Sequence, residues 1–312
     1  MKNYQHTEIT FPSSDGIHTI CADVYAPTDR YPRAIIQLAH GMTDYVARYE
    51  ELASYLVAHG FVFAGHQHLG HYKTAADERD LGFFAERDGV RHLVRDMNTM
   101  NKTLRETYPS IPLVVLGHSM GSFISRLYVE KHPHGVDGFI IHGTGGKNPA
   151  VPFGLAVAGA IRLFAGPRAR SRMLKALAFT GYNARFPKEE GNLAWLTRDV
   201  SETAKYKGDP YTTFTFTVSA YADLFRLLRD CNAKIWFQNY PKNMPTLIMS
   251  GDADPVGGYG KGVSYVYKHL LLSGAGNVQM KLYPGARHEL FNELCREESF
   301  RDIAAFVEEI VG

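Results

Sequence analysis

Gly117-His118-Ser119-Met120-Gly121 is the stretch that decides the fold of this 312-residue chain. An apolar run at 113–116 precedes it, and apolar residues follow it at helical spacing (Phe123, Ile124, Leu127 and Tyr128). A serine at a sharp strand-to-helix turn has a strained backbone and an exposed hydroxyl. The flanking glycines let the helix and the strand cross closely, where a side chain would collide. We therefore predict that Ser119 is a nucleophile.

The pattern G-x-S-x-G is short enough to occur by chance, so its meaning depends on two later segments. In the fold built around this turn, the chain order is serine, then acid, then histidine. A strand-like run at 246–249 is followed by Ser250-Gly251-Asp252-Ala253-Asp254-Pro255. A second strand-like run at 278–283 is followed by Pro284-Gly285-Ala286-Arg287-His288-Glu289. The chain thus offers an acid and a histidine in the required order, each just after a strand.

A serine hydroxyl is a poor nucleophile at neutral pH and needs a base, for which His288 is the candidate. A buried aspartate would fix the tautomer of this imidazole and stabilise its charged form. Asp254 is the preferred acid, and Asp252 is expected to hydrogen-bond the turn, although both lie in the right loop. The alternative for His288 is a surface histidine that opens a helix.

Attack on a carbonyl creates an oxyanion, which backbone N–H groups must stabilise. One predicted donor is the amide of Met120, at the N-terminus of the helix after Ser119. The other is the amide of Met42, in the loop after the strand at 34–39, where Gly41 allows close backbone approach. His40 and Gly41 are also predicted to lie at the substrate site, and His40 is expected to shape the loop there. The expected reaction is acyl transfer through Ser119, and it needs no cofactor.

Residues 36–133 and 245–291 resemble the monoacylglycerol lipase and lysophospholipase branch of the α/β hydrolases, also called the serine aminopeptidase S33-like or Hydrolase_4 group. The matching segments are His40-Gly41-Met42, Arg48-Tyr49-Glu50-Glu51-Leu52-Ala53, Gly70-His71 and the stretch around Ser119. The resemblance implies a triad and two oxyanion donors (Ser119, Asp254, His288; Met42, Met120). It also implies hydrolysis of a lipid-like ester. Family members usually carry an aspartate where this chain has Gln67, so the hydrogen bonding there is expected to differ.

Alternating strands and helices predict a mostly parallel sheet of about eight strands with helices on both faces, the α/β-hydrolase fold. A hairpin at 4–11 and 18–26 opens the sheet. Predicted strands follow at 34–39, 61–66, 111–117 and 137–142, and predicted helices at 46–59, 88–107 and 120–132. Residues 147–240 are helix-like and aromatic. We predict that they form a helical cap inserted into a core made of residues 1–146 and 241–312.

Apolar residues of the predicted cap, among them Phe153 and Ile161, are candidates to line an acyl-chain tunnel. Each buried methylene would contribute about 0.8 kcal/mol to binding. The alternative is that these side chains only bury the cap against the core. The first part of the cap is basic and has no acidic residue (Arg162, Arg168, Arg170, Arg172, Lys175, Arg185 and Lys188). This favours peripheral contact with anionic membranes, with an ordinary solvated helix surface as the alternative.

The composition is that of an ordinary globular protein, with 45% hydrophobic and 21% charged residues. A net charge of +2 does not predict nucleic-acid binding. No apolar stretch is long enough to span a bilayer, and the polar start lacks a signal-peptide core. Cys21, Cys231 and Cys295 lie far apart, so we expect free thiols and a cytoplasmic location. The sequence does not indicate an oligomeric state.

Three rival interpretations remain. His66-Gln67-His68-Leu69-Gly70-His71 is similar to a dinuclear zinc motif, but Gly70 stands where a metal-binding aspartate would be, so we predict no metal site. The same serine site would also suit amides or thioesters. Finally, some proteins of this fold use the pocket as a receptor for small molecules.

Overall fold

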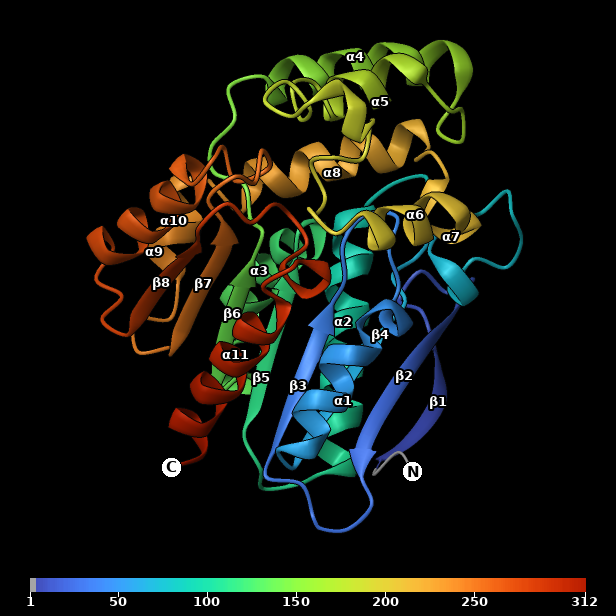
Figure 1. The fold of residues 1–312 in the computed structure, drawn as a ribbon. Helices are drawn as coiled ribbons and strands as arrows, with labels where there is room; N and C mark the ends of the chain where they lie inside the picture. The colour runs from blue at the N-terminus through green and yellow to red at the C-terminus, as the bar shows by residue number, and fades with distance from the viewer. Residues whose placement is uncertain (1–3) are drawn as a thin grey trace.

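An eight-stranded sheet in the order β1-β2-β4-β3-β5-β6-β7-β8 forms the centre of the computed structural model, which describes residues 4–312 (Figure 1). β1 and β2 form the predicted antiparallel hairpin, and β2 is also antiparallel to β4. All other neighbouring strands are parallel. The strands are β1 (Tyr4–Pro12), β2 (Thr19–Pro27), β3 (Ala34–Ala39), β4 (Phe61–His66), β5 (Leu113–His118), β6 (Gly138–His142), β7 (Thr246–Gly251) and β8 (Val278–Tyr283). The predicted mostly parallel sheet is confirmed.

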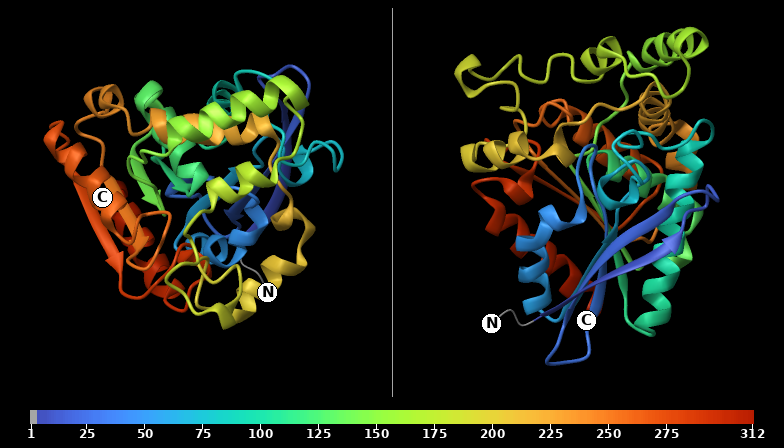
Figure 2. Two further views of the ribbon diagram at one scale, coloured as in Figure 1. Left: turned by 90° about the horizontal axis from the view of Figure 1, so that it is seen from above. Right: turned by 90° about the vertical axis from the view of Figure 1, so that its right-hand side faces the viewer.

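Helices cover both faces of the sheet, which explains why its central strands are almost continuously apolar. Side chains alternate between faces, so Ile35 packs in one core cluster and Ile36 in the other. Figure 2 shows α1 and α11 on one side of the sheet and α2 on the other. The core helices are α1 (Glu50–Ala58), α2 (Gly89–Thr107), α3 (Met120–Lys131), α10 (Lys261–Leu272) and α11 (Arg296–Val311). Short 3₁₀ helices are η1 (Val46–Tyr49), η2 (Tyr72–Thr74), η3 (Pro133–Gly135), η4 (Lys188–Glu190) and η5 (Leu290–Asn292).

The segment between β6 and β7, here called the insertion (residues 147–240), is helical. It contains α4 (Val151–Ala165), α5 (Arg172–Ala178), α6 (Val200–Gly208), α7 (Pro210–Thr213), α8 (Val218–Asp230) and α9 (Lys234–Asn239). α4 and α5 lie farthest from the sheet, and α8 lies between them and the core (Figure 1). α4 and α8 approach closely at Gly154, which has no side chain. A Cβ at this position would collide with the ring of Phe225 on α8.

The parallel strands all end at the edge of the sheet that faces the insertion (Figure 1). In open α/β sheets, ligands bind in the crevice outside these strand ends. Within residues 4–312, no helix combines the length and apolarity needed to cross a bilayer. Cys21, Cys231 and Cys295 are free thiols, as the sequence predicts.

Candidate active site

Ser119 stands at the turn between β5 and α3 with a φ of +52° and a ψ of −120°. Non-glycine residues rarely adopt this conformation, and such strain is typical of functional turns. A side chain at Gly117 would collide with the Ser125 hydroxyl, and one at Gly121 would collide with the Ala39 carbonyl. The two glycines therefore allow β5, α3 and β3 to cross closely, as predicted.

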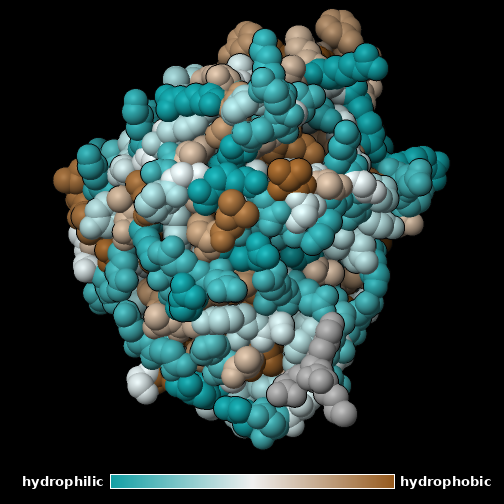
Figure 3. All heavy atoms as spheres, viewed as in Figure 1, coloured by the Kyte–Doolittle hydropathy of each residue, from teal (hydrophilic) through white to brown (hydrophobic). Residues whose placement is uncertain are grey.

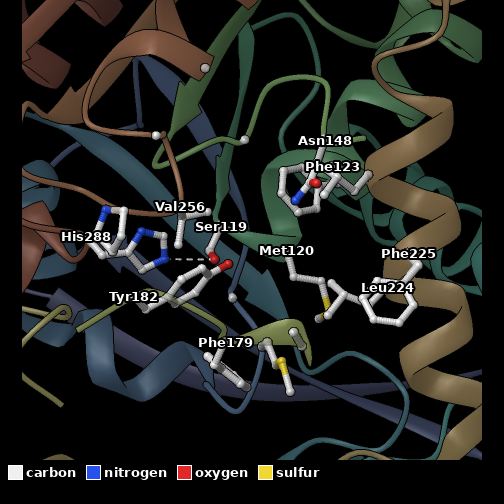
Figure 4. Close-up of a pocket in the computed structure, with 18 of the residues that line it drawn as sticks. Ser119, Met120, Phe123, Asn148, Phe179, Tyr182, Leu224, Phe225, Val256 and His288 are labelled. Atoms are coloured by element: carbon white, nitrogen blue, oxygen red, sulfur yellow. Dashed lines mark hydrogen bonds between the residues drawn. The ribbon is translucent and has the colours of Figure 1, made fainter. Parts of the chain in front are cut away.

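Ser119, His288 and Asp254 are joined in one chain of hydrogen bonds, although they are far apart in sequence. Figure 4 shows the bond between Ser119 and His288. The Ser119 Oγ lies 2.8 Å from the His288 Nε2, and the His288 Nδ1 lies 3.0 Å from the Asp254 Oδ2. His288 is only 2% exposed and Asp254 is fully buried. The alternative that His288 is a surface histidine is therefore wrong.

The partners of His288 determine its tautomer. An ionised carboxylate only accepts hydrogen bonds, so the proton of the neutral imidazole lies on Nδ1 and is donated to Asp254. Nε2 is then free to accept the Ser119 hydroxyl proton. The Asp254 carboxylate is itself held in place, because it also accepts bonds from the Val256 N–H (2.8 Å) and the Ser250 hydroxyl (3.2 Å).

Asp252 lies on the same loop but points elsewhere. It is exposed, and its Oδ1 accepts the Gly285 N–H at 2.7 Å. This hydrogen bond joins the loop after β7 to the loop after β8, so Asp252 holds the turn, as predicted.

The loop after β3, here called the β3–η1 loop (residues 40–45), lies against Ser119. A side chain on Gly41 would come within 3.4 Å of the Ser119 Cβ. Met42 and Met120 line the cavity beside Ser119. In the part of the chain that the structure describes, neither backbone N–H has a protein acceptor. Both groups are therefore available to a ligand oxygen at this position.

A cavity of about 430 Å³ opens above Ser119, between the sheet edge and the insertion. Figure 4 shows Met120, Leu224 and Phe225 on one side of Ser119 and His288 on the other. The apolar part of the wall comes from α3 and the insertion (Phe123, Val151, Phe153, Leu177, Phe179, Leu224, Phe225 and Leu228). Polar and charged groups are fewer and include Asp44, Lys147, Asn148, Lys261 and Glu289. The cavity is thus suited to a largely apolar ligand.

Two residues predicted to contact the substrate do not line this cavity, whereas Gly41 and Phe153 do. Ile161 lies about 12 Å farther along α4 than Phe153, which places it beyond the cavity. Its half-buried side chain packs against the hydrophobic core instead. His40 is fully buried below the loop. Its Nδ1–H donates to the Gly41 carbonyl (2.9 Å) and its Nε2 accepts the His68 N–H (3.1 Å). His40 therefore shapes the loop, and both substrate-contact predictions need this correction.

Sequence reasoning missed Trp195 and Tyr182, which cover His288 from the insertion. The Trp195 ring centre lies 5.1 Å from that of His288. The backbone carbonyl of Trp195 accepts the backbone N–H of His288 at 3.3 Å. Tyr182 packs edge-on against Trp195, with ring centres 5.0 Å apart. No local pattern marks either residue, because the surrounding segment is rich in aromatic side chains throughout.

The Gln67 side chain connects β2 to the beginning of η1. Its Nε2 donates to the Asp23 Oδ2 at 2.6 Å, and its Oε1 accepts the Val46 N–H at 3.1 Å. An aspartate at position 67 would place two carboxylates together and lack the donor. The side-chain amide of Gln67 therefore supplies the hydrogen-bond donor that the Asp23 carboxylate needs.

The histidines at positions 66, 68 and 71 are fully buried. Among residues 4–312, no group of three or more His, Cys, Asp or Glu side chains is arranged to hold a metal ion. His68 donates from Nε2 to the His40 carbonyl (3.2 Å), and His71 accepts the Thr43 N–H (3.2 Å). These neutral rings therefore support the β3–η1 loop. Both ring nitrogens of His66 lack a partner.

Acid should destabilise the fold through these histidines. Burial lowers the pKa of both His66 and His71 to about 3, whereas an unfolded histidine titrates near about 6.5. Below that pH the unfolded chain binds protons that the folded chain excludes, so stability falls as the pH decreases toward 3. Each residue should cost about 2 kcal/mol by pH 5. His66→Leu should therefore reduce the difference in unfolding free energy between pH 7 and pH 5, measured with urea.

The exposed His134 supplies the control, since His134→Leu should leave that difference unchanged. An unaltered pH dependence in His66→Leu would contradict this account of the buried ring.

Several known proteins are similar to this chain over most of its length. The family model described as "Serine aminopeptidase, S33" (Hydrolase_4) matches residues 30–295. The chain is 28% identical to a monoglyceride lipase homolog of monkeypox virus, over 84% of each chain. It is 27% identical to a monoacylglycerol lipase of Mycolicibacterium smegmatis, over 98% of this chain and 99% of the relative. A thermostable carboxyl esterase of Bacillus coagulans, solved with glycerol, superimposes with a TM-score of 0.92 at 30% identity, covering 98% of this chain and 99% of that one.

These likenesses confirm the resemblance to the monoacylglycerol lipase-like branch and support a carboxylic-ester hydrolase. The family model spans most of the chain, including the loops that carry Ser119, Asp254 and His288. The chain therefore belongs to the serine aminopeptidase S33 (Hydrolase_4) family of α/β-hydrolases.

Proposed function

We propose that this protein hydrolyses carboxylic esters of lipid-like substrates, such as monoacylglycerols or lysophospholipids, through an acyl-enzyme on Ser119. One observation carries the proposal: the hydrogen-bonded series Ser119–His288–Asp254 lies at the base of a largely apolar cavity. An activated hydroxyl supplies the chemistry, and the apolar wall suits an acyl chain.

In the first half of the reaction, the Ser119 Oγ attacks the ester carbonyl carbon and the His288 Nε2 takes its proton. The carbonyl oxygen becomes an oxyanion, which accepts hydrogen bonds from the backbone N–H groups of Met42 and Met120. Preorganised donors of this kind typically contribute about 10²–10³-fold each to the rate. When the tetrahedral intermediate collapses, the bond to the alcohol oxygen breaks, and His288 returns the proton to the leaving alcohol.

In the second half, a water molecule attacks the acyl-enzyme carbonyl while His288 removes one of its protons. The Ser119 Oγ leaves, receives this proton from His288, and the carboxylic acid is released. Asp254 remains ionised throughout and stabilises the imidazolium that forms in each half.

The cavity wall is the basis for the lipid-like substrate. Burying acyl methylenes against Phe123, Leu224 and Phe225 would contribute about 0.8 kcal/mol each. A panel of nitrophenyl esters, monoacylglycerols and lysophospholipids tests the substrate class, with and without a serine-directed fluorophosphonate. Matched thioesters and anilides test the amidase and thioesterase alternatives. Rapid multiple turnover of esters supports the proposal, whereas one slow turnover with retained product would support a receptor.

We further propose that α4 rests on the surface of a membrane. Large apolar side chains of this helix face solvent: Leu163 is 84% exposed and Phe164 is 92% exposed. Hydrophobic residues protrude at this end of the molecule (Figure 3). Several basic residues of the insertion are engaged within the protein, since Arg168 pairs with Asp80 at 2.8 Å and Arg185 stacks on Tyr259. The apolar face of α4 is therefore the main proposed contact, with the remaining cations at its border.

The double substitution Leu163→Ser/Phe164→Ser should weaken vesicle binding by at least about tenfold, because two apolar side chains no longer enter the lipid interface. Co-sedimentation with phosphatidylcholine vesicles, with and without phosphatidylserine, measures this. Leu272→Ser, which changes an equally exposed leucine on α10, is the control. Equal binding to both vesicle types would argue against the basic contribution, and unchanged binding of the double variant would argue against α4.

A further inference from the structure

Arg48, on η1, lies between two loops that each carry part of the proposed catalytic machinery. Its Nη1 donates to the Asp44 Oδ1 at 2.7 Å. Its Nη2 and Nη1 donate to the two Glu289 carboxylate oxygens at 2.9 Å and 3.3 Å. Only 12% of the Arg48 side chain is exposed, and both carboxylates are more deeply buried. One guanidinium thus forms ion pairs with two buried carboxylates that are 245 residues apart in sequence.

Asp44 connects this guanidinium to the backbone beside Ser119. Its Oδ2 accepts the Gly41 N–H at 3.3 Å and the Tyr49 hydroxyl at 2.5 Å. Gly41 immediately precedes Met42, the proposed oxyanion donor. Although burial opposes ionisation, the charge of Arg48 holds the pKa of Asp44 below its usual value. Asp44 is therefore a charged anchor for the β3–η1 loop.

Glu289 connects the same guanidinium to the catalytic histidine, because it follows His288 directly in the loop after β8, here called the β8–η5 loop (residues 284–289). Its carboxylate also accepts the Asn292 side-chain amide at 2.9 Å. Its backbone N–H donates to the Leu196 carbonyl at 2.8 Å. The position of His288 along this loop is thus tied to Arg48 through a single residue.

Tyr206, on α6, completes the arrangement from the insertion. The Arg48 guanidinium lies 4.9 Å from the Tyr206 ring centre. The Tyr206 hydroxyl lies 2.7 Å from the Thr43 Oγ1. Thr43 has a φ of +50° and follows Met42, so the backbone at this point is strained and depends on its partners. The three contacts of Arg48 therefore all lead to groups beside the oxyanion position or the histidine.

We propose that Arg48 is a positioning residue that holds the β3–η1 loop and the β8–η5 loop at the separation required for catalysis. This inference rests on the proposed function. A planar guanidinium fixes two carboxylates at set angles, which the ammonium of lysine does not. Because misplacement of catalytic groups by about 1 Å can lower rates about 10²-fold, a loose connection here should slow the chemical step.

Arg48→Lys keeps the positive charge but loses the planar guanidinium that hydrogen-bonds both carboxylates at once. We expect kcat for nitrophenyl esters to fall about 10- to 100-fold with KM changed less than about threefold. The rate of Ser119 labelling by a fluorophosphonate should fall in parallel. Arg296 offers a matched control, since it also joins two carboxylates (Glu51 at 3.0 Å and Asp199 at 3.3 Å) away from the cavity. Arg296→Lys should retain kcat within about twofold.

Asp44→Asn and Glu289→Gln test the connection without changing Arg48. If one guanidinium couples the loops, the two losses in kcat should not multiply in the double variant, because the first substitution already releases the connection. Multiplying losses, a wild-type kcat in Arg48→Lys, or a rise in KM alone would each overturn the proposal. All variants are assayed below their unfolding midpoints. Absence of esterase activity and fluorophosphonate labelling in the wild-type protein would instead refute the proposed function.

Discussion

Replacing Ser119 by alanine is expected to lower kcat/KM for esters by about 10⁵- to 10⁶-fold, which is the typical cost of removing a catalytic serine. In the proposed mechanism the hydroxyl oxygen of Ser119 forms the acyl-enzyme, and among the described residues no other hydroxyl is hydrogen-bonded to His288. The fold should persist, because alanine keeps the Cβ and the surrounding packing. Steady-state ester hydrolysis, fluorophosphonate labelling and circular dichroism together measure the effect.

Ser125 is a suitable control for this substitution. It is also a buried serine close to Ser119 in sequence, but its hydroxyl donates to the Ser122 carbonyl within α3, at 3.2 Å. Ser125→Ala should keep activity within about threefold, as expected for one neutral hydrogen bond away from the reacting atoms. If Ser119→Ala kept more than a trace of activity with intact labelling, the nucleophile would have to be sought elsewhere.

Asp254→Asn should lower kcat by about 10³- to 10⁴-fold, as the same change does in other serine triads. An amide at this position presents an N–H to the His288 Nδ1 and so favours the tautomer that carries its proton on Nε2. That nitrogen then cannot accept the Ser119 proton. The amide oxygen can still accept the Val256 N–H, so the loop should remain in place. Stopped-flow measurement of acylation, with thermal unfolding as the check on folding, would quantify this.

Asp252→Asn is the matched comparison, because it makes the same chemical change two residues away. The new amide oxygen still accepts the Gly285 N–H, and Asp252 has no bond to His288. We expect a kcat within about threefold of wild type, together with a small loss of stability. The reverse ranking of the two variants would assign the acid to Asp252 and would refute the triad as proposed.

The two distant connections to His288 differ in kind. Asp254 touches the imidazole itself, whereas Arg48 reaches it only through the neighbouring Glu289. A change in tautomer should therefore affect the acid–base step directly, and a change at Arg48 should affect geometry. The larger expected loss for Asp254→Asn follows from this difference.

The sequence alone determined the elements of the fold and most of the proposed site. Hydrophobic periodicity reports which face of each helix or strand is buried, so the strands at 34–39, 61–66 and 278–283 were predicted with their observed bounds. The glycines around Ser119 marked a turn whose chemistry is local. The serine, the histidine and the loop with two candidate acids could all be identified because each follows a strand.

Only the tertiary structure decided which groups meet. Asp252 and Asp254 have nearly the same local sequence context, and the path of the loop after β7 is what buries one and exposes the other. Ile161 has the right residue type but lies too far along α4, while Trp195 covers His288 without any local signal. The grip of Arg48 on Asp44 and Glu289 depends on how two separate loops are placed by the folded sheet. Local patterns encode burial and backbone conformation, but contacts between distant loops arise from the packing of the whole chain.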